Sequence, residues 1–154
     1  MKKLSFLIIA VFLIGMANAQ SNSEQVDLIQ SVFGMEKKAI VEEFVEVDPS
    51  QKDAFWKLYD EYEEKRKELG KRRIELLTQY VEGFENLNNE SAESWTKEAI
   101  SLTAKTDKLL VSYQKKISKA TNPLVALQFY QVEQYILTGI RMSILEELPL
   151  PDVK

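Results

Sequence analysis

The sequence predicts an all-α protein, an elongated antiparallel bundle or hairpin of about four helices. Three observations predict this class. Glu, Lys, Leu, Gln and Ala dominate beyond the first nineteen residues, and these residue types favour helices. Apolar residues recur at steps of three and four, and no segment alternates apolar and polar residues as a strand would. The four prolines stand at positions 49, 123, 149 and 151, where we expect helices to begin or end.

Residues 1–19 have the pattern of a secretory signal peptide. Lys2 and Lys3 precede an apolar run over 4–14, and Ala17-Asn18-Ala19 supplies the small-residue pattern that signal peptidase recognises. The run is too short for a stable bilayer anchor, and no cysteine follows that could carry a lipid. We therefore expect cleavage and a single mature domain, residues 20–154, in a bacterial periplasm. The alternative is an N-terminal anchor that is not cleaved.

The first helix is predicted over about 24–46, and a well-marked boundary follows it. Asp48 is a good N-cap residue, Pro49 suits the first helical position, and Gln51 stands where the partner in a capping box belongs. The apolar residues of the first helix fall on one face, which comprises Val26, Ile29, Phe33, Ile40, Phe44 and Val47.

The second helix is predicted over about 49–85 and has a heptad-like seam. Arg66 and Arg73 occupy two positions of this seam, where apolar residues would be expected. A helix of this length would span about 55 Å, which favours an elongated molecule or a dimer. The apolar seam residues are Phe55, Tyr59, Tyr62, Leu69, Leu76 and Tyr80.

Two further helices follow a polar turn over 86–91. The third is predicted over about 92–120, with a stripe formed by Trp95, Ala99, Leu102, Thr106, Leu109, Tyr113 and Ile117. The fourth begins with Asn122 as N-cap and Pro123 at the first helical position, and it ends before Pro149. Its predicted core face comprises Val125, Phe129, Val132, Ile136, Ile140 and Ile144, broadened by Tyr135 and Leu137.

The composition argues against several classes of function. The chain has no histidine and no cysteine, so the usual general base, thiol nucleophile and soft metal ligands are missing. After cleavage, 18 basic residues stand against 24 acidic ones, a net charge of about −6, which disfavours nucleic-acid binding. The acidic groups over 42–48 and 61–64 lack calcium-loop spacing and are expected to be solvated. We predict no enzyme activity, no catalytic residue, no cofactor and no metal.

A basic block on the second helix is the candidate functional feature. It covers 65–67 and 71–73, and tyrosines of the same face lie nearby. Such a cationic and aromatic face could hold polypeptides. The alternatives are a solvated helix surface with charges paired to neighbouring glutamates, and aromatic side chains that belong to the bundle core. The candidate protein-binding residues are Tyr59, Tyr62, Lys65, Arg66, Arg73 and Tyr80.

A helix opened by Val47-Asp48-Pro49-Ser50-Gln51, followed by a long charged helix, resembles the Spy/CpxP group of periplasmic proteins. That group carries an L-T-x-x-Q motif at helix starts, often with proline after the threonine. Here Val47 stands for the apolar residue, Asp48 for the capping threonine, and Gln51 is retained. A second copy would fall near Thr121-Asn122-Pro123, where position 125 is valine rather than glutamine. The segment from Ala126 to Glu133 also looks like a stretch of uncharacterised exported helical proteins.

The resemblance implies a cradle-shaped helical protein that is often dimeric. Members bind unfolded or stress-damaged polypeptides without ATP, or dock on a sensor kinase. We therefore expect an ATP-independent periplasmic chaperone or envelope-stress binding protein, whose partners are unfolded or specific envelope proteins. The alternative is a helical adaptor or structural interaction module with one dedicated protein partner. A homodimer is compatible with either hypothesis.

Overall fold

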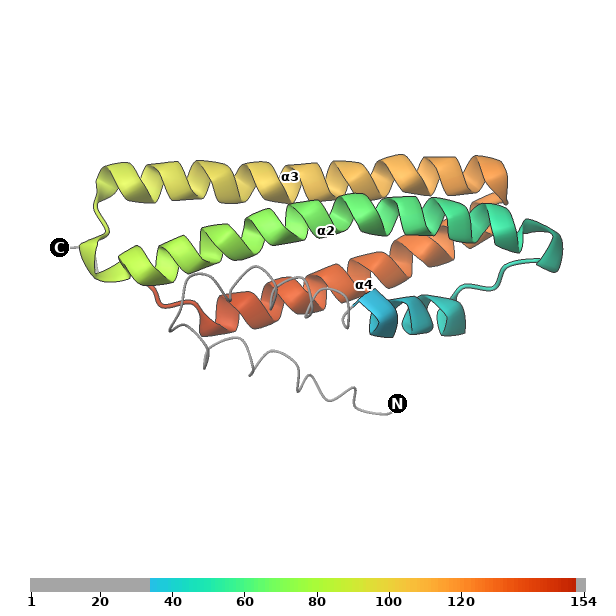
Figure 1. Ribbon diagram of the computed structural model, residues 1–154, viewed down its shortest axis with the longest axis horizontal. Coiled ribbons are helices and arrows are strands. Elements are labelled where there is room, and N and C mark those ends of the chain that lie inside the picture. Colours follow the sequence, from blue (N-terminus) through green and yellow to red (C-terminus); the bar gives the residue numbers. More distant parts are fainter. Residues whose placement is uncertain (1–33, 152–154) are drawn as a thin grey trace.

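The computed structural model describes residues 34–151, and within them the protein is an all-α bundle (Figure 1). Residues 34–44 are helical, and three long helices follow: α2 (Lys52–Gly83), α3 (Asn89–Ala120) and α4 (Pro123–Glu147). Two 3-10 turns, η2 (Pro49–Gln51) and η3 (Phe84–Asn86), flank α2. The prediction of four helices without strands is confirmed for these residues. The predicted signal peptide over 1–19 and the first helix's predicted start over 24–33 lie outside them.

Helices α2 and α3 form an antiparallel hairpin, and α4 returns antiparallel to α3. Arg72 on α2 bonds Glu98 on α3, with Nη2 and Oε1 2.6 Å apart. Arg141 on α4 bonds Asp107 on α3 over the same distance. The connections between these helices are short, which favours antiparallel neighbours. Since both α2 and α4 oppose α3, they run parallel to each other, and the long axes of all three follow the length of the molecule (Figure 1).

The helix over 34–44 packs beside the first half of α2 and beside α4 (Figure 1). Lys38 Nζ lies 2.6 Å from Asp60 Oδ1 on α2, and the Glu46 amide donates to Gln128 Oε1 on α4 at 2.9 Å. Val41 and Val45 enter the main core from this segment. The helix ends two residues earlier than predicted, at residue 44.

The core follows the predicted seams with several differences. Phe44 and Tyr135, both predicted on core faces, are exposed, because their side chains point away from the neighbouring helices. On α3 Leu110 is fully buried, whereas the predicted Leu109 is only partly covered beside it. Charged side chains are also buried at four positions: Lys37, Glu63, Arg66 and Glu133. The main cluster comprises Val41, Val45, Phe55, Tyr59, Tyr62, Leu110, Tyr113, Ile117, Val125, Ala126, Phe129 and Leu137.

The helix starts are fixed by side-chain caps. Asp48 accepts from the Ser50 amide at 2.9 Å, which confirms it as a cap, here of η2. The prediction of Gln51 as capping-box partner is wrong, because its amide group donates to the Thr121 carbonyl at 3.3 Å and joins α2 to the α3–α4 connection. A capping box occurs instead between Asn88 and Ser91, so α3 begins three residues earlier than predicted.

Asn122 caps α4 as predicted, and its replacement tests the strength of this cap. Its Oδ1 accepts from the amides of Leu124 at 2.9 Å and Val125 at 3.1 Å. Asn122→Ala leaves both amides without this acceptor and is expected to lower the free energy of unfolding by about 1 kcal/mol. Urea unfolding followed by circular dichroism measures the change. Asn122→Asp, which retains an acceptor, is the matched control and should lose far less.

The residues that follow α4 fold back toward α2. The Tyr80 hydroxyl donates to the Pro149 carbonyl at 2.8 Å, while Leu150 beyond it is exposed. The Tyr80 ring also packs on Trp95 of α3, with centroids 4.7 Å apart. Tyr80 therefore joins α2, α3 and the tail at one end of the bundle.

Candidate functional site

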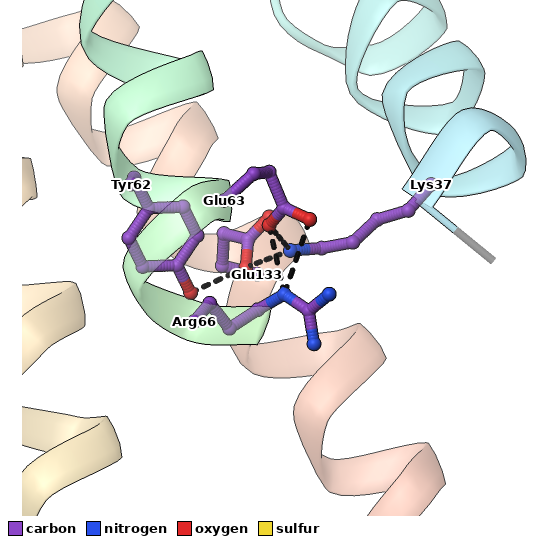
Figure 2. A network of polar contacts seen from close by, with 5 residues as sticks. All are labelled: Lys37, Tyr62, Glu63, Arg66 and Glu133. Atoms are coloured by element: carbon purple, nitrogen blue, oxygen red, sulfur yellow. Dashed lines mark hydrogen bonds and ion pairs between the residues drawn. The ribbon is translucent and has the colours of Figure 1, made fainter. Parts of the chain in front are cut away.

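A buried network of charged side chains joins the helix over 34–44, α2 and α4 (Figure 2). Lys37 comes from the helix over 34–44, Tyr62, Glu63 and Arg66 come from α2, and Glu133 comes from α4. Figure 2 shows the Lys37 side chain reaching between the two carboxylates. The four charged side chains carry two positive and two negative formal charges, so the network is neutral in sum.

The contacts within this network are short and specific. Lys37 Nζ bonds Glu63 Oε1 and lies 2.7 Å from Glu133 Oε2. The same Glu133 oxygen accepts from the Tyr62 hydroxyl at 2.7 Å. Arg66 Nε donates to both Glu63 oxygens, at 3.0 and 3.1 Å. Burial of paired charges costs solvation energy, which close pairing offsets only when the geometry is good. These contacts supply that geometry.

The two carboxylates of the network have opposite pKa shifts. Burial raises the pKa of Glu133, and the neighbouring Glu63 charge adds to this, although Lys37 and Tyr62 act against it. Burial also acts to raise the pKa of Glu63, but the charges of Lys37 and Arg66 outweigh it and hold that pKa below its ordinary value. Glu63 is therefore the firmly ionised member, and Glu133 is the carboxyl that takes up a proton first on acidification.

This asymmetry predicts a dependence of stability on pH. Between the ordinary glutamate pKa of 4.5 and the raised pKa of Glu133, the folded protein binds more protons than the unfolded chain. The Glu133 contribution to the free energy of unfolding therefore falls as pH rises through this window. Below pH 4.5 the lowered pKa of Glu63 has the opposite effect on the free energy of unfolding. The stabilisation that ionised Glu63 contributes is lost as pH falls through the pKa of Glu63 in the folded protein.

Urea unfolding of the wild type and of Glu133→Gln at a series of pH values above 4.5 tests this dependence. The variant lacks the titrating carboxyl, so its stability should change less steeply with pH than that of the wild type. Equal slopes for the two proteins would show that Glu133 does not titrate as inferred.

Two members of the network lie wholly inside the bundle. The side chains of Lys37 and Glu133 are 1% and 0% exposed. Among residues 34–151 no group of three or more His, Cys, Asp or Glu side chains is arranged to hold a metal ion. An open depression on the α2 surface beside the network has lining residues of both signs: Lys57, Asp60, Glu61, Glu63, Glu64 and Lys67.

The six predicted binding residues do not form one exposed surface. Tyr59, Tyr62, Arg66 and Tyr80 are buried, so their prediction as an accessible face is wrong. Heptad seam positions face the bundle interior, which is why the tyrosines pack there. Arg66 follows them inward because Glu63, three residues earlier on the same helix face, neutralises it.

The other two predicted residues lie apart from each other. Lys65 is exposed, and its Nζ is 5.4 Å from the centroid of the Tyr113 ring on α3. Arg73 is half-buried, and its Nη2 donates to Thr103 Oγ1 on α3 at 3.0 Å. Burial and the nearby charge of Arg141 lower the pKa of Arg73. Both seam arginines thus bond within the bundle.

Sequence reasoning missed Lys37 and Glu133, although a signal for both exists. Lys37 stands four residues after Phe33 and three before Ile40, and Glu133 has the same spacing between Phe129 and Ile136. Each therefore occupies a position of an apolar stripe, as Arg66 does. Opposite charges at stripe positions of different helices indicate a buried ion network.

No family model, curated protein or solved structure matches this chain. The resemblance to the Spy/CpxP group therefore stays a prediction that rests on the residues quoted for it. No helix within 34–151 is long and apolar enough to cross a membrane.

A second apolar face lies on α4, opposite the face that enters the core. Its members repeat at three- and four-residue steps, so they line one side of the helix. All seven are exposed, and the five apolar ones are 47% to 73% exposed. We call this set the α4 outer stripe; it comprises Leu124, Leu127, Gln131, Tyr135, Thr138, Met142 and Leu145.

The α4 outer stripe differs in charge from the other long helices. None of its seven residues is charged, and α4 as a whole contains only Glu133, Arg141, Glu146 and Glu147 as charged residues. Helices α2 and α3 carry many more charged residues along their lengths. A row of exposed, uncharged side chains about 32 Å long, five of the seven apolar, is unusual on a monomer and typical of a protein-binding surface.

Proposed function

We propose that this protein is a non-enzymatic helical interaction module of the bacterial cell envelope, which binds a dedicated protein partner through the α4 outer stripe. The single observation that carries the proposal is this exposed, uncharged stripe on the side of α4 that faces away from the core. An amphipathic helix with a matching apolar stripe is the kind of surface that fits it.

The position of the aromatic residues favours a dedicated partner over broad client binding. Four of the six residues on which broad binding was predicted to depend, Tyr59, Tyr62, Arg66 and Tyr80, are buried inside the bundle. The two arginines among the six bond Glu63 and Thr103 instead of facing solvent. A helix face with regular spacing suits a partner of matching spacing better than it suits irregular unfolded chains.

A general ATP-independent chaperone is the second candidate function. One observation favours it: the α4 outer stripe has no charged residue, so it would not discriminate between clients by their charge. The stripe also includes Met142, a flexible side chain of the kind found on surfaces that accept many partners.

Cross-linking in living cells separates these functions. A photoreactive amino acid replaces Tyr135 in the stripe, and Ser112 on the exposed side of α3 in the matched control. A dedicated partner gives one discrete product from position 135 and none from 112. A broad ladder of products from 135 would favour the chaperone instead. Indistinguishable patterns from the two positions would overturn the proposal that the stripe binds proteins.

The envelope location has a separate test. The pattern of Lys2, Lys3 and the 4–14 apolar run supports export, and Ala17-Asn18-Ala19 supports cleavage after residue 19. We expect the full-length gene product, expressed in a Gram-negative host, to be recovered from the periplasmic fraction with Gln20 as its first residue. Recovery of the protein from the cytoplasm with Met1 intact would contradict the proposed envelope location.

A further inference from the structure

We infer that the partner of the α4 outer stripe is a second copy of this chain, with the two α4 helices antiparallel about a two-fold axis near Tyr135. This inference rests on the proposed function, because it names the occupant of the same surface. Its support is the order of residue types along the stripe and the position of the acidic residues at its end.

The order of residue types along the α4 outer stripe makes it complementary to a second, antiparallel copy of itself. When two copies are placed antiparallel with the axis between Gln134 and Tyr135, Leu124 faces Leu145 of the second copy, and Leu127 faces Met142. Apolar side chains thus meet apolar side chains at both ends of the contact. Gln131 faces Thr138, and these two polar side chains can hydrogen-bond each other. The two Tyr135 rings meet at the axis, as the self-complementarity of a two-fold interface requires.

Charge favours the antiparallel arrangement over the parallel one. Glu146 is exposed in the last turn of α4, and no basic residue stands in that turn to offset it. In an antiparallel pair Glu146 lies beside Pro123 of the second copy, at the positive end of that helix's dipole, which attracts a carboxylate. In a parallel pair the two Glu146 carboxylates would face each other and repel. The uncharged stripe between these ends adds no repulsion.

The absence of cysteine allows a direct test of register. Single cysteines are introduced by Gln131→Cys, Tyr135→Cys, Thr138→Cys and, as a control on exposed α3, Ser112→Cys. The full chain is expressed with its N-terminal segment, so that the host processes it, and each variant is purified and oxidised alone or in mixtures. In the antiparallel pair the two copies of position 131 are about 10 Å apart along the axis, beyond the roughly 7 Å that a disulfide spans.

The expected result is a wild-type molar mass of two chains by light scattering and a self-disulfide for Tyr135→Cys alone. Gln131→Cys and Thr138→Cys should link to each other in a mixture and hardly to themselves. Tyr135→Glu should give the mass of one chain, while Ser112→Glu should leave the dimer intact.

Three outcomes would overturn the inference. Self-disulfides at 131, 135 and 138 alike would indicate a parallel pair. A dimer that forms no disulfide at 135 would place the interface elsewhere. A purified wild type with the mass of one chain at every concentration would exclude the second copy, while a discrete cellular cross-link from position 135 would still support a different protein on the stripe.

Discussion

Lys37→Met is expected to lower the free energy of unfolding by about 3–5 kcal/mol, the range found when one partner of a buried ion pair is removed. The ammonium group of Lys37 bonds carboxylates on two helices, Glu63 and Glu133. Methionine retains much of the side-chain volume but leaves Glu133 in the interior with only the Tyr62 hydroxyl as a described hydrogen-bond donor. Most of the loss therefore reflects the cost of an uncompensated buried carboxylate.

The next residue provides a matched control. Lys38 also forms an ion pair, with Asp60 at 2.6 Å, but both side chains are substantially exposed to water. Water solvates these charges well once they separate, so Lys38→Met should cost less than about 1 kcal/mol. Denaturant unfolding of the two variants at pH 7 measures the difference. Equal losses would contradict the inference that burial of Lys37 determines its contribution.

A double-variant cycle tests whether the cost arises from unbalanced charge. Glu133→Gln alone leaves an excess positive charge in the network, Lys37→Met alone leaves an excess negative charge, and the double variant is neutral again. The double variant should therefore lose less stability than the sum of the two single losses, by about 0.5–3 kcal/mol. Additive losses would mean that the two side chains act independently.

Phe129→Ala is expected to cost about 3–5 kcal/mol, because it opens a cavity at the centre of the aromatic core. The Phe129 ring is fully buried and meets three rings of α2 edge to face. Its centroid lies 5.4 Å from that of Tyr62, 6.3 Å from Phe55 and 6.4 Å from Tyr59. The substitution removes contacts that join α4 to α2 as well as apolar burial. Thermal and urea unfolding measure the loss.

Ile100→Ala on α3 is the matched control for Phe129→Ala. Ile100 is exposed, so its truncation removes little buried area and should change the free energy of unfolding by less than about 0.5 kcal/mol. A loss below about 1.5 kcal/mol for Phe129→Ala would mean that the surrounding rings collapse into the vacated space.

The sequence predicts the architecture well because helix periodicity and caps are local signals. The caps at Asp48 and Asn122 and the seam of α2 follow from residue types a few positions apart. The start of α3 differs by three residues because Asn88 and Ser91 cap each other, a polar pattern that also suits a turn. Gln51 satisfies a carbonyl seventy residues away, which local spacing cannot indicate.

The candidate sites depend on which helices meet, and local patterns do not contain that information. The pairing of Arg66 with a neighbouring glutamate was one of the alternatives, but the sequence does not show that this pair lies inside the bundle. The structure supplies Glu63, and it brings Lys37 and Glu133 to the same point. The α4 outer stripe was missed because the apolar residues of α4 surround the helix, and the predicted core face included Tyr135, which is exposed.

The helical residues 34–44 lie against the aromatic rings of α2, and this position has a consequence for hydrogen exchange. Lys37 Nζ is 5.0 Å from the Tyr62 ring centroid, and Lys38 Nζ is 5.1 Å from that of Trp56. A segment that packs on one side of a bundle opens locally at lower cost than the long helices of its hairpin do. Amide protons of 34–44 should therefore exchange with solvent before those in the middle of α2, and each opening briefly exposes aromatic surface that the resting bundle conceals.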